Sequence, residues 1–270
     1  MSSLQNITGT IALAGAGKMG GAMLTGWLAQ GLAPAHVVVI EPAPSAETAA
    51  LAAKGVQLNP KDIGSVETLV VAVKPQSFRA AAAALKPLVG HTTLVVSIMA
   101  GMTIASIEQM CGGAVVRAMP NTPAAIGRGI TVAVAAKAVS AAQRARANAL
   151  LSSIGAVEWV DDETLMDAVT AVSGSGPAYI FVLAEELARA GIEAGLPEAL
   201  ATKLARETVA GSGELLHRSD LAAETLRQNV TSPGGTTAAA LSVLMSKDGL
   251  QQLMIRAVAA ATARSKELAK

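Results

Sequence analysis

The sequence predicts an α/β fold, with a mostly parallel sheet covered by helices on both faces and an all-helical segment after it. Two observations predict this arrangement. Short, continuous apolar runs alternate with Ala-rich helical stretches in the first half, which is typical of buried parallel strands. After about Asp161, apolar residues recur at helical spacing and no strand is evident. We therefore divide the 270 residues into a sheet domain, 1–163, and a helical domain, 164–270.

Six apolar runs bounded by turn residues are the predicted strands. They are residues 10–14, 37–40, 69–73, 94–97, 115–118 and 130–134. Helices are predicted between them, beginning with residues 21–30 and an Ala-rich stretch that ends at Lys54. In the second half the predicted helices are residues 164–191, with a Ser- and Gly-rich break at 173–179, then 197–217 and 221–230. A last helix begins at Thr237 and has a possible break near residues 247–249.

Composition excludes several classes of function. The formal net charge is +1 and Lys and Arg form no dense run, so nucleic acid is not an expected partner. Cys111 is the only cysteine, which suits a reducing cytoplasm. The uncharged stretches 87–107 and 168–184 contain Gly and hydroxyl residues and do not predict spanning helices, and residues 1–10 lack a signal-peptide pattern. We expect a soluble, cytoplasmic protein without membrane contact, whose excess apolar surface forms an oligomer interface.

A glycine-rich loop between the first strand and the first helix predicts a dinucleotide site. The motif is G-x-G-x-x-G, in which the first glycine permits the turn, the second admits a pyrophosphate and the third lets helix and strand pack closely. The helix N-terminus then presents free N–H groups to the phosphates. This context predicts a Rossmann-like domain that binds NAD or NADP. The loop consists of Gly15, Ala16, Gly17, Lys18, Met19 and Gly20.

Glu41 ends the second predicted strand, about 20 residues after the glycines, where an acidic residue usually accepts hydrogen bonds from the adenosine ribose hydroxyls. This position favours NAD. An NADP site usually offers Arg, Lys or Ser nearby, and only Ser45 among the next four residues has such a side chain. The alternative interpretation of Glu41 is an exposed charge at a strand end. The preference between the two cofactors is left open.

Other strand ends offer weaker candidates, and strong catalytic groups are absent from the pattern. Lys74 follows a strand and would face a phosphate or a substrate carboxylate, or would be a solvated residue at a helix start. The loop 117–123 is fixed by two prolines and contains Asn121. The histidines are scattered and no cluster has metal-ligand spacing, so no metal site is predicted. Hydride transfer to an activated acceptor, such as a protonated imine, needs positioning more than acid–base catalysis.

A second glycine-rich loop, residues 230–237, interrupts the helical half. It has free N–H groups and four hydroxyl side chains, and no acidic residue lies between Arg227 and Asp248. These features predict a site for a small carboxylate. The alternative is an ordinary connector between helices.

Together these segments resemble the Δ1-pyrroline-5-carboxylate reductase family. The matching residues are 15–20, 72–75, 119–123, 173–179 and 232–237, in the family's order along the whole chain. The last two motifs are the most specific. The resemblance implies reduction of L-1-pyrroline-5-carboxylate to L-proline by NAD(P)H. It also implies a helical domain that forms a homodimer, an active site between one subunit's nucleotide domain and its partner's helices, and a larger homo-oligomer in many members.

The resemblance also implies roles for individual residues. Thr237 would hydrogen-bond the ring nitrogen and is the candidate catalytic residue, while Ser232, Gly234, Gly235 and Thr236, with Thr237, would bind the substrate. Asn229 would approach the cofactor or the substrate loop, and Asn59 is a tentative counterpart of an Asn that contacts the adenosine. The remaining cofactor residues implied by the family are Ala72, Val73, Lys74 and Pro75, of which the first three border the nicotinamide.

Two other classes fit part of the pattern. β-Hydroxyacid dehydrogenases also join a Rossmann-like domain to helices, but they usually depend on a Lys in the helical domain, and Lys203 is the only interior candidate. A non-catalytic module that senses a dinucleotide and dimerises through its helices would need no carboxylate loop. Cofactor binding without turnover would support the second alternative.

Overall fold

The computed structural model describes residues 4–268, which form two compact units. The first comprises residues 4–174 and 261–268, and the second comprises Ser175–Ala260. The predicted domain division between residues 163 and 164 stays a prediction. Among the described residues, no helix is both long enough and apolar enough to cross a bilayer.

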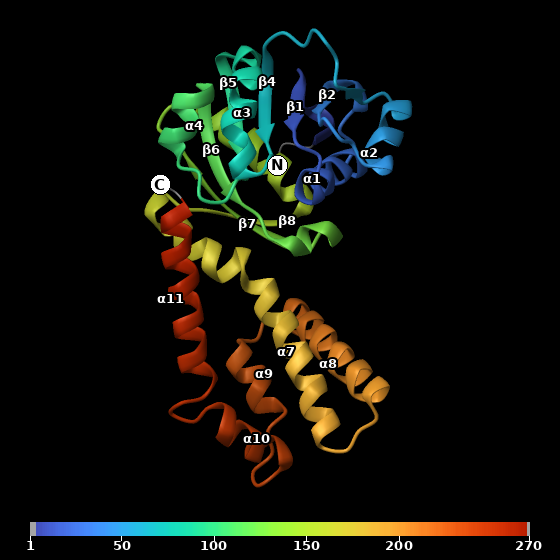
Figure 1. Ribbon diagram of the computed structural model, residues 1–270, viewed down its shortest axis with the longest axis vertical. Coiled ribbons are helices and arrows are strands. Elements are labelled where there is room, and N and C mark those ends of the chain that lie inside the picture. Colours follow the sequence, from blue (N-terminus) through green and yellow to red (C-terminus); the bar gives the residue numbers. More distant parts are fainter. Residues whose placement is uncertain (1–3, 269–270) are drawn as a thin grey trace. The chain divides into compact units, whose positions relative to one another are not determined.

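The first unit contains one eight-stranded sheet with the order β3-β2-β1-β4-β5-β6-β7-β8 (Figure 1). Neighbouring strands are parallel except at the antiparallel pair of β6 and β7. The predicted mostly parallel α/β fold is therefore confirmed. The strands are β1 Ile11–Ala14, β2 Val37–Ile40, β3 Gln57–Leu58, β4 Val66–Val71, β5 Val89–Ser97, β6 Ala114–Met119, β7 Gly129–Ala135 and β8 Gly155–Trp159.

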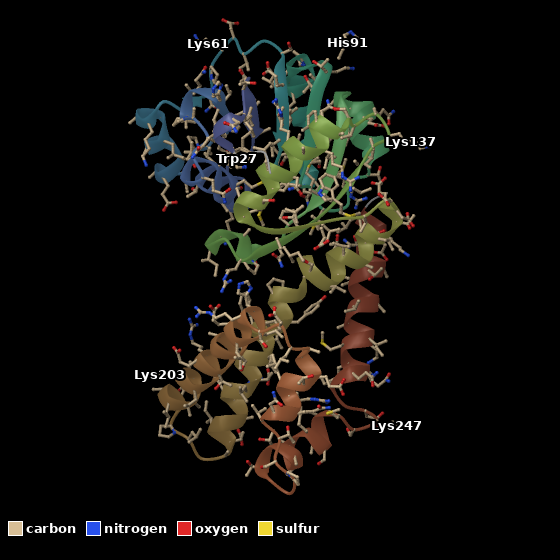
Figure 2. The ribbon with its side chains drawn as sticks, turned by 180° about the vertical axis from the view of Figure 1, so that it is seen from behind. Trp27, Lys61, His91, Lys137, Lys203 and Lys247 are labelled. Carbon is tan, nitrogen blue, oxygen red and sulfur yellow. The ribbon has the colours of Figure 1, made fainter. Side chains whose placement is uncertain are left out.

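Apolar side chains cover both faces of this sheet, as the continuous apolar strands predict. Successive β1 residues point to opposite faces, so Leu13 joins one core cluster and Ala12 joins the other. The first cluster contains the fully buried Trp27 (Figure 2). Its indole Nε1 donates to the carbonyl oxygen of Leu150 at 2.9 Å. The second contains Phe78 of α3. The helices of this unit are α1 Lys18–Ala29, α2 Ala46–Ala50, α3 Pro75–Leu85, α4 Ile104–Cys111, α5 Ala141–Leu151 and α6 Met166–Val169.

The second unit is helical, as predicted, and buries very few of its own residues. Among the described residues 175–260, only Ala201 and Ala205 are buried. Both lie on the face of α8 that meets α7, where a Cβ at Gly191 would stand 3.2 Å from that of Ala201. The close approach therefore depends on small residues. The helices are α7 Gly176–Glu193, α8 Glu198–Arg218, α9 Ala223–Asn229, α10 Thr236–Leu244 and α11 Leu250–Leu268, which ends in the first unit.

The interruption predicted at residues 173–179 lies earlier, at residues 170–175, because residues 176–179 already belong to α7. Before α7 the backbone forms a π-helical turn, Thr170–Gly174, and a Cβ at Gly174 would lie 2.5 Å from Cε of Met119. A larger residue at position 174 would therefore displace the end of the Met119 side chain. Between α10 and α11 the chain turns at Gly249, where a Cβ would overlap the carbonyl oxygen of Leu244. The predicted break near residues 247–249 is thus confirmed.

Candidate active site

The carboxyl ends of β1, β2 and β4 bring several of the predicted cofactor residues to one edge of the sheet. The chain leaves β1 for β2 and β3 on one side and then crosses to β4 on the other side (Figure 1). This reversal of strand order is a topological switch point, the usual binding place in an open α/β sheet. The loops after β1, β2 and β4 lie together there.

The glycine loop has the geometry that a pyrophosphate requires. Gly15 has φ +92°, which favours glycine, and its N–H donates to the carbonyl oxygen of Ile40 at 2.9 Å. A Cβ at Gly20 would overlap the carbonyl oxygen of Gly15, so the third glycine is needed for packing. By contrast, a Cβ at Gly17 would meet no heavy atom within 4 Å. Gly17 is the N-cap of α1 and makes no side-chain cap, so the open surface there suits an anionic group.

Glu41 lies against the glycine loop. Its Oε2 accepts from the N–H of Ala16 at 2.9 Å, and its Oε1 accepts from the N–H of Ala43 at 3.1 Å. A carboxylate oxygen has more than one lone pair, so both oxygens can still accept from hydroxyl groups. The arrangement is compatible with the predicted ribose contact, which stays a prediction.

Asn59 follows β3 and is joined to Glu41 by two backbone contacts. The Oδ1 of Asn59 accepts from the N–H of Glu41, and the Nδ2 donates to the carbonyl oxygen of Glu41, each at 2.9 Å. Its own N–H donates to the carbonyl oxygen of Val39 at 2.8 Å. With φ +48°, Asn59 lies in the left-handed region, which Asn tolerates better than most residues. Its direct contact with the adenosine stays a prediction, and its visible partner is the Glu41 backbone.

The end of β4 borders the glycine loop. The N–H of Ala72 donates to the carbonyl oxygen of Ala14 at 2.7 Å, and a Cβ at Gly15 would stand 2.8 Å from the carbonyl group of Ala72. The next residues start α3, with the exposed Lys74 as N-cap and Pro75 as its first residue. The structure therefore places residues 72–75 at the same edge as the glycines.

Sequence reasoning missed an ion pair close to this edge. Arg117 of β6 is 5% exposed, and its Nη1 donates to Oε1 of Glu163 at 2.8 Å. The same oxygen accepts from the N–H of Ile104, the first residue of α4, at 2.8 Å. Glu163 therefore joins β6 to the start of α4. The available signal was Arg117 in an apolar run, because a buried arginine requires a partner.

The predicted carboxylate loop lies in the second unit. Gly234 has φ +69° and the N–H of Gly235 donates to the carbonyl oxygen of Ser232 at 3.1 Å, which is typical of a type II turn with Pro233 before the glycine. Gly235 is the N-cap of α10 and makes no side-chain cap. The first N–H groups of this nine-residue helix, which begins with Thr236, therefore face the turn without an internal partner.

The other predicted residues of the second unit lie beside this turn. Thr237 is half-buried on the first turn of α10, and the exposed Asn229 ends α9. Thr231 Oγ1 donates to the carbonyl oxygen of Arg227 at 2.7 Å, which fixes the chain between Asn229 and the turn. The glycine loop and the carboxylate loop belong to different compact units, and their convergence stays a prediction.

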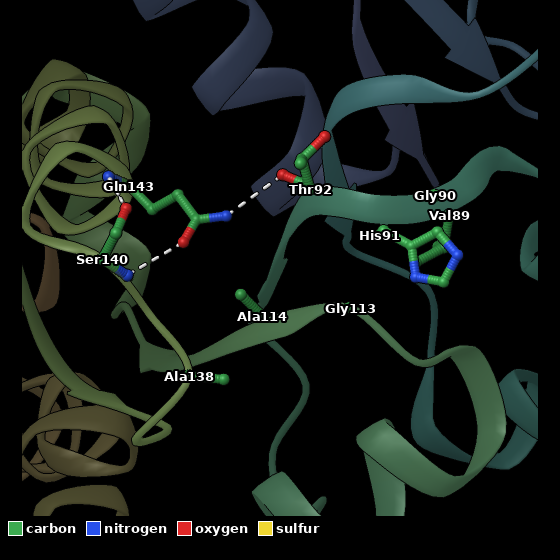
Figure 3. A pocket seen from close by; sticks show the side chains of 9 residues that line it. All are labelled: Val89, Gly90, His91, Thr92, Gly113, Ala114, Ala138, Ser140 and Gln143. Carbon is green, nitrogen blue, oxygen red and sulfur yellow. Dashed lines mark hydrogen bonds between the residues drawn. The ribbon is translucent and has the colours of Figure 1, made fainter.

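Two hollows in the first unit are large enough to be candidate sites. A groove of about 780 Å³ runs from Gly17 and Lys18 along α1 to Ser45. A cavity of about 720 Å³ lies instead at the amino ends of β5 and β6 (Figure 3). Two of its polar side chains have structural roles, because Ser140 and Gln143 form the capping box of α5 and Gln143 Nε2 donates to the carbonyl oxygen of Thr92 at 3.1 Å. The cavity also lies away from the glycine loop. The groove beside the glycine loop is therefore the better candidate.

Residues 4–268 contain no group of three His, Cys, Asp or Glu side chains placed to hold a metal ion. Cys111 is buried, and burial raises the pKa of its thiol, with Lys86 acting in the opposite direction. A thiol with a raised pKa is a weak nucleophile. Cys111 is therefore not a catalytic candidate.

A doubly wound sheet with a glycine-rich loop at its switch point defines a dinucleotide-dependent oxidoreductase. Residues 163–268 match the family described as pyrroline-5-carboxylate reductase dimerisation, and residues 10–101 match the family described as NADP oxidoreductase coenzyme F420-dependent. The chain is 40% identical to the pyrroline-5-carboxylate reductase of Pseudomonas aeruginosa, over 97% of this chain and 98% of the relative. It is 41% identical to that of Synechocystis sp., over 96% and 98%.

Solved structures agree with these relatives. The pyrroline-5-carboxylate reductase of Coxiella burnetii superposes with a TM-score of 0.88 at 35% identity, covering 98% of this chain and 100% of that one. The pyrroline carboxylate reductase of Plasmodium falciparum, solved with NADP bound, gives 0.80 at 29% identity, covering 98% and 99%. The chain belongs to the pyrroline-5-carboxylate reductase family, and the resemblance drawn from its sequence motifs is confirmed.

Proposed function

We propose that this chain reduces 1-pyrroline-5-carboxylate to proline with NADH or NADPH, the last step of proline biosynthesis. One observation carries the proposal. This member of the family has both a glycine loop at the switch point, before α1, and an uncapped, glycine-rich start of α10. The first suits a dinucleotide and the second suits a small carboxylate.

The glycine loop and the neighbouring strand ends hold the cofactor. The N–H groups at the start of α1 face the pyrophosphate, and the open surface at Gly17 admits it. Glu41 accepts hydrogen bonds from the adenosine ribose, residues 72–74 border the nicotinamide, and Asn229 approaches the cofactor or the substrate loop. When bound, the reduced nicotinamide supplies a hydride.

The carboxylate loop holds the substrate. The N–H groups of Gly234 and Thr236 and the Ser232 hydroxyl bind the substrate carboxylate, while Gly235, whose N–H closes the turn, shapes the pocket. Each such hydrogen bond to a charged group contributes roughly 1.5–3 kcal/mol. Thr237 hydrogen-bonds the ring nitrogen and holds a proton there. With the cofactor bound, hydride transfer to C5 of the protonated imine would move the C=N π electrons onto the nitrogen and give proline. The main contribution of the residues is therefore position rather than acid–base strength.

The assembly completes the site. Apolar side chains more than half exposed in the second unit include Phe181, Leu215 and Ile255, and a matching surface on a second copy would cover them. The dimerisation family that residues 163–268 match supports a homo-oligomer. We propose a homodimer whose active site lies between one subunit's nucleotide domain and its partner's helices, with further assembly into a larger ring, in the cytoplasm.

The test is an absorbance assay of cofactor oxidation with 1-pyrroline-5-carboxylate, in which proline is identified by mass spectrometry. Turnover with stoichiometric proline supports the proposal. Cofactor binding without turnover would favour the dinucleotide-sensing module, and oxidation of β-hydroxyacids without imine reduction would favour the β-hydroxyacid dehydrogenase alternative. The variant Lys203→Ala separates the last case, because only a β-hydroxyacid dehydrogenase would depend on that side chain.

A further inference from the structure

We infer that Glu41, positioned by Asn59, makes this enzyme selective for NADH over NADPH. The inference deepens the proposed function and rests on it, because it names which of the two nicotinamide cofactors the same site accepts. It concerns two residues outside the substrate loop, and it assigns Asn59 a positioning role in place of a direct contact.

The carboxylate of Glu41 has a fixed orientation. Its two oxygens accept separate backbone N–H groups, one from the glycine loop at Ala16 and one from Ala43, so the side chain spans the space between the β1 and β2 loops. A negative charge held at the end of β2 suits ribose hydroxyl donors. The same charge repels a 2′-phosphate, which carries up to two negative charges of its own.

Asn59 fixes the backbone on which this carboxylate stands. Its amide donates to the carbonyl oxygen of Glu41 and accepts from the N–H of Glu41, so one side chain holds both backbone groups of a single residue. The residue adopts a left-handed conformation at φ +48° to do so. Because both amide atoms of Asn59 bond the Glu41 backbone, we assign the effect of Asn59 on the cofactor to the position of Glu41.

The surrounding charges do not favour a phosphate. Residues 42–53 contain no Lys, Arg or His, and they add a second carboxylate, Glu47. The lysines nearest along the chain are exposed: Lys18 on the pyrophosphate loop, Lys54 at the end of its helical turn, and Lys61 on the loop between β3 and β4 (Figure 2). None of them has a hydrogen bond or ion pair to Glu41 or Asn59 among the described contacts. The NADP in the Plasmodium falciparum structure belongs to a relative at 29% identity.

The test measures cofactor affinity by calorimetry without substrate, together with kcat/KM for both cofactors. Wild type is expected to bind NADH at least tenfold more tightly than NADPH. Glu41→Ser and Glu41→Gln should shift the ratio of the two dissociation constants toward NADPH by tenfold or more. Asn59→Gly keeps the left-handed backbone but loses the amide, so it should weaken NADH at least threefold and leave NADPH nearly unchanged.

The control Glu108→Gln changes an exposed carboxylate on α4 and should leave the ratio within twofold of wild type. Circular dichroism of each variant confirms that it is folded. Equal or tighter binding of NADPH by wild type, or an unchanged ratio in Glu41→Ser, overturns the inference and leaves the proposed function standing. Binding of neither cofactor overturns both.

Discussion

The open surface at Gly17 allows the cofactor site to be perturbed without disturbing the fold. In Gly17→Ala the new Cβ would meet no heavy atom within 4 Å, and the residue already has φ −68° and ψ −161°, which alanine adopts readily. Replacing glycine by alanine restricts the unfolded chain, which stabilises the folded protein by about 0.4–1 kcal/mol. Replacing glycine by alanine at an N-cap costs roughly 0.5–1 kcal/mol. The two terms oppose each other, so the free energy of unfolding should change by less than about 1 kcal/mol, or about 4 °C in Tm.

The same methyl group occupies the surface that the pyrophosphate must approach. We therefore expect Gly17→Ala to weaken the affinity for both NADH and NADPH by tenfold or more, about 1.4 kcal/mol. Gly20→Ala is the contrasting variant, because its Cβ would overlap the Gly15 carbonyl oxygen and press on Cβ of Ala72 at 3.1 Å. It should lower the free energy of unfolding by about 1–3 kcal/mol, as overpacking does.

The assay pairs thermal unfolding with calorimetric titration of each cofactor. The expected pattern is loss of affinity at nearly constant Tm for Gly17→Ala, and a lower Tm for Gly20→Ala. If Gly17→Ala binds both cofactors with the affinity of wild type, the glycine loop does not hold the pyrophosphate. The cofactor would then have to be placed elsewhere in the molecule.

Three further outcomes are expected. Thr237→Ala should lower kcat at least tenfold with a Tm within a few degrees of wild type, and Thr237→Ser should retain most turnover; equal turnover in all three would remove Thr237 from the mechanism. Glu163→Ala leaves the Arg117 guanidinium buried without its partner, so thermal melts should show a free energy of unfolding lower by about 2–3 kcal/mol. This value is below the range for fully buried pairs because the Glu163 side chain is 30% exposed. An unchanged Tm would contradict this expectation. Burial raises the pKa of the Cys111 thiol, so ionisation of the thiol opposes folding, and its contribution to stability is lost as the pH rises through the raised pKa. Iodoacetamide should therefore react with Cys111 only after denaturation. Rapid labelling of the native protein would show that the thiol is accessible.

The parallel sheet could be predicted because its strands carry a strong local signal. β1 and β2 are short runs of apolar residues bounded by turns, and the structure gives Val37–Ile40 the predicted bounds. β3 and β8 lack that signal. β3 has two residues, and β8 alternates half-buried and exposed positions at the sheet edge, with Glu158 inside it. Edge strands depend on their neighbours rather than on their own composition.

The site was predictable only where one segment carries the whole pattern. The six residues of the glycine loop are enough to predict the turn, the phosphate contact and the close packing of helix on strand. The contacts between Asn59 and Glu41 join residues 18 positions apart, and Glu163 meets Arg117 across 46 positions. No local spacing encodes such contacts, because the sheet order brings them together. A buried charge is the only local indication that such a partner exists.

The helices of the second unit were predicted correctly, but their apolar side chains are not buried within the single chain. α7 and α8 occur as predicted, yet apolar side chains such as Phe181 and Leu215 are more than half exposed in the single chain. Burial of side chains of this size contributes roughly 1.5–3 kcal/mol each. A unit with two buried residues among those described has too little core of its own. We therefore expect the thermal stability of this unit to rise with protein concentration, because association would cover these side chains.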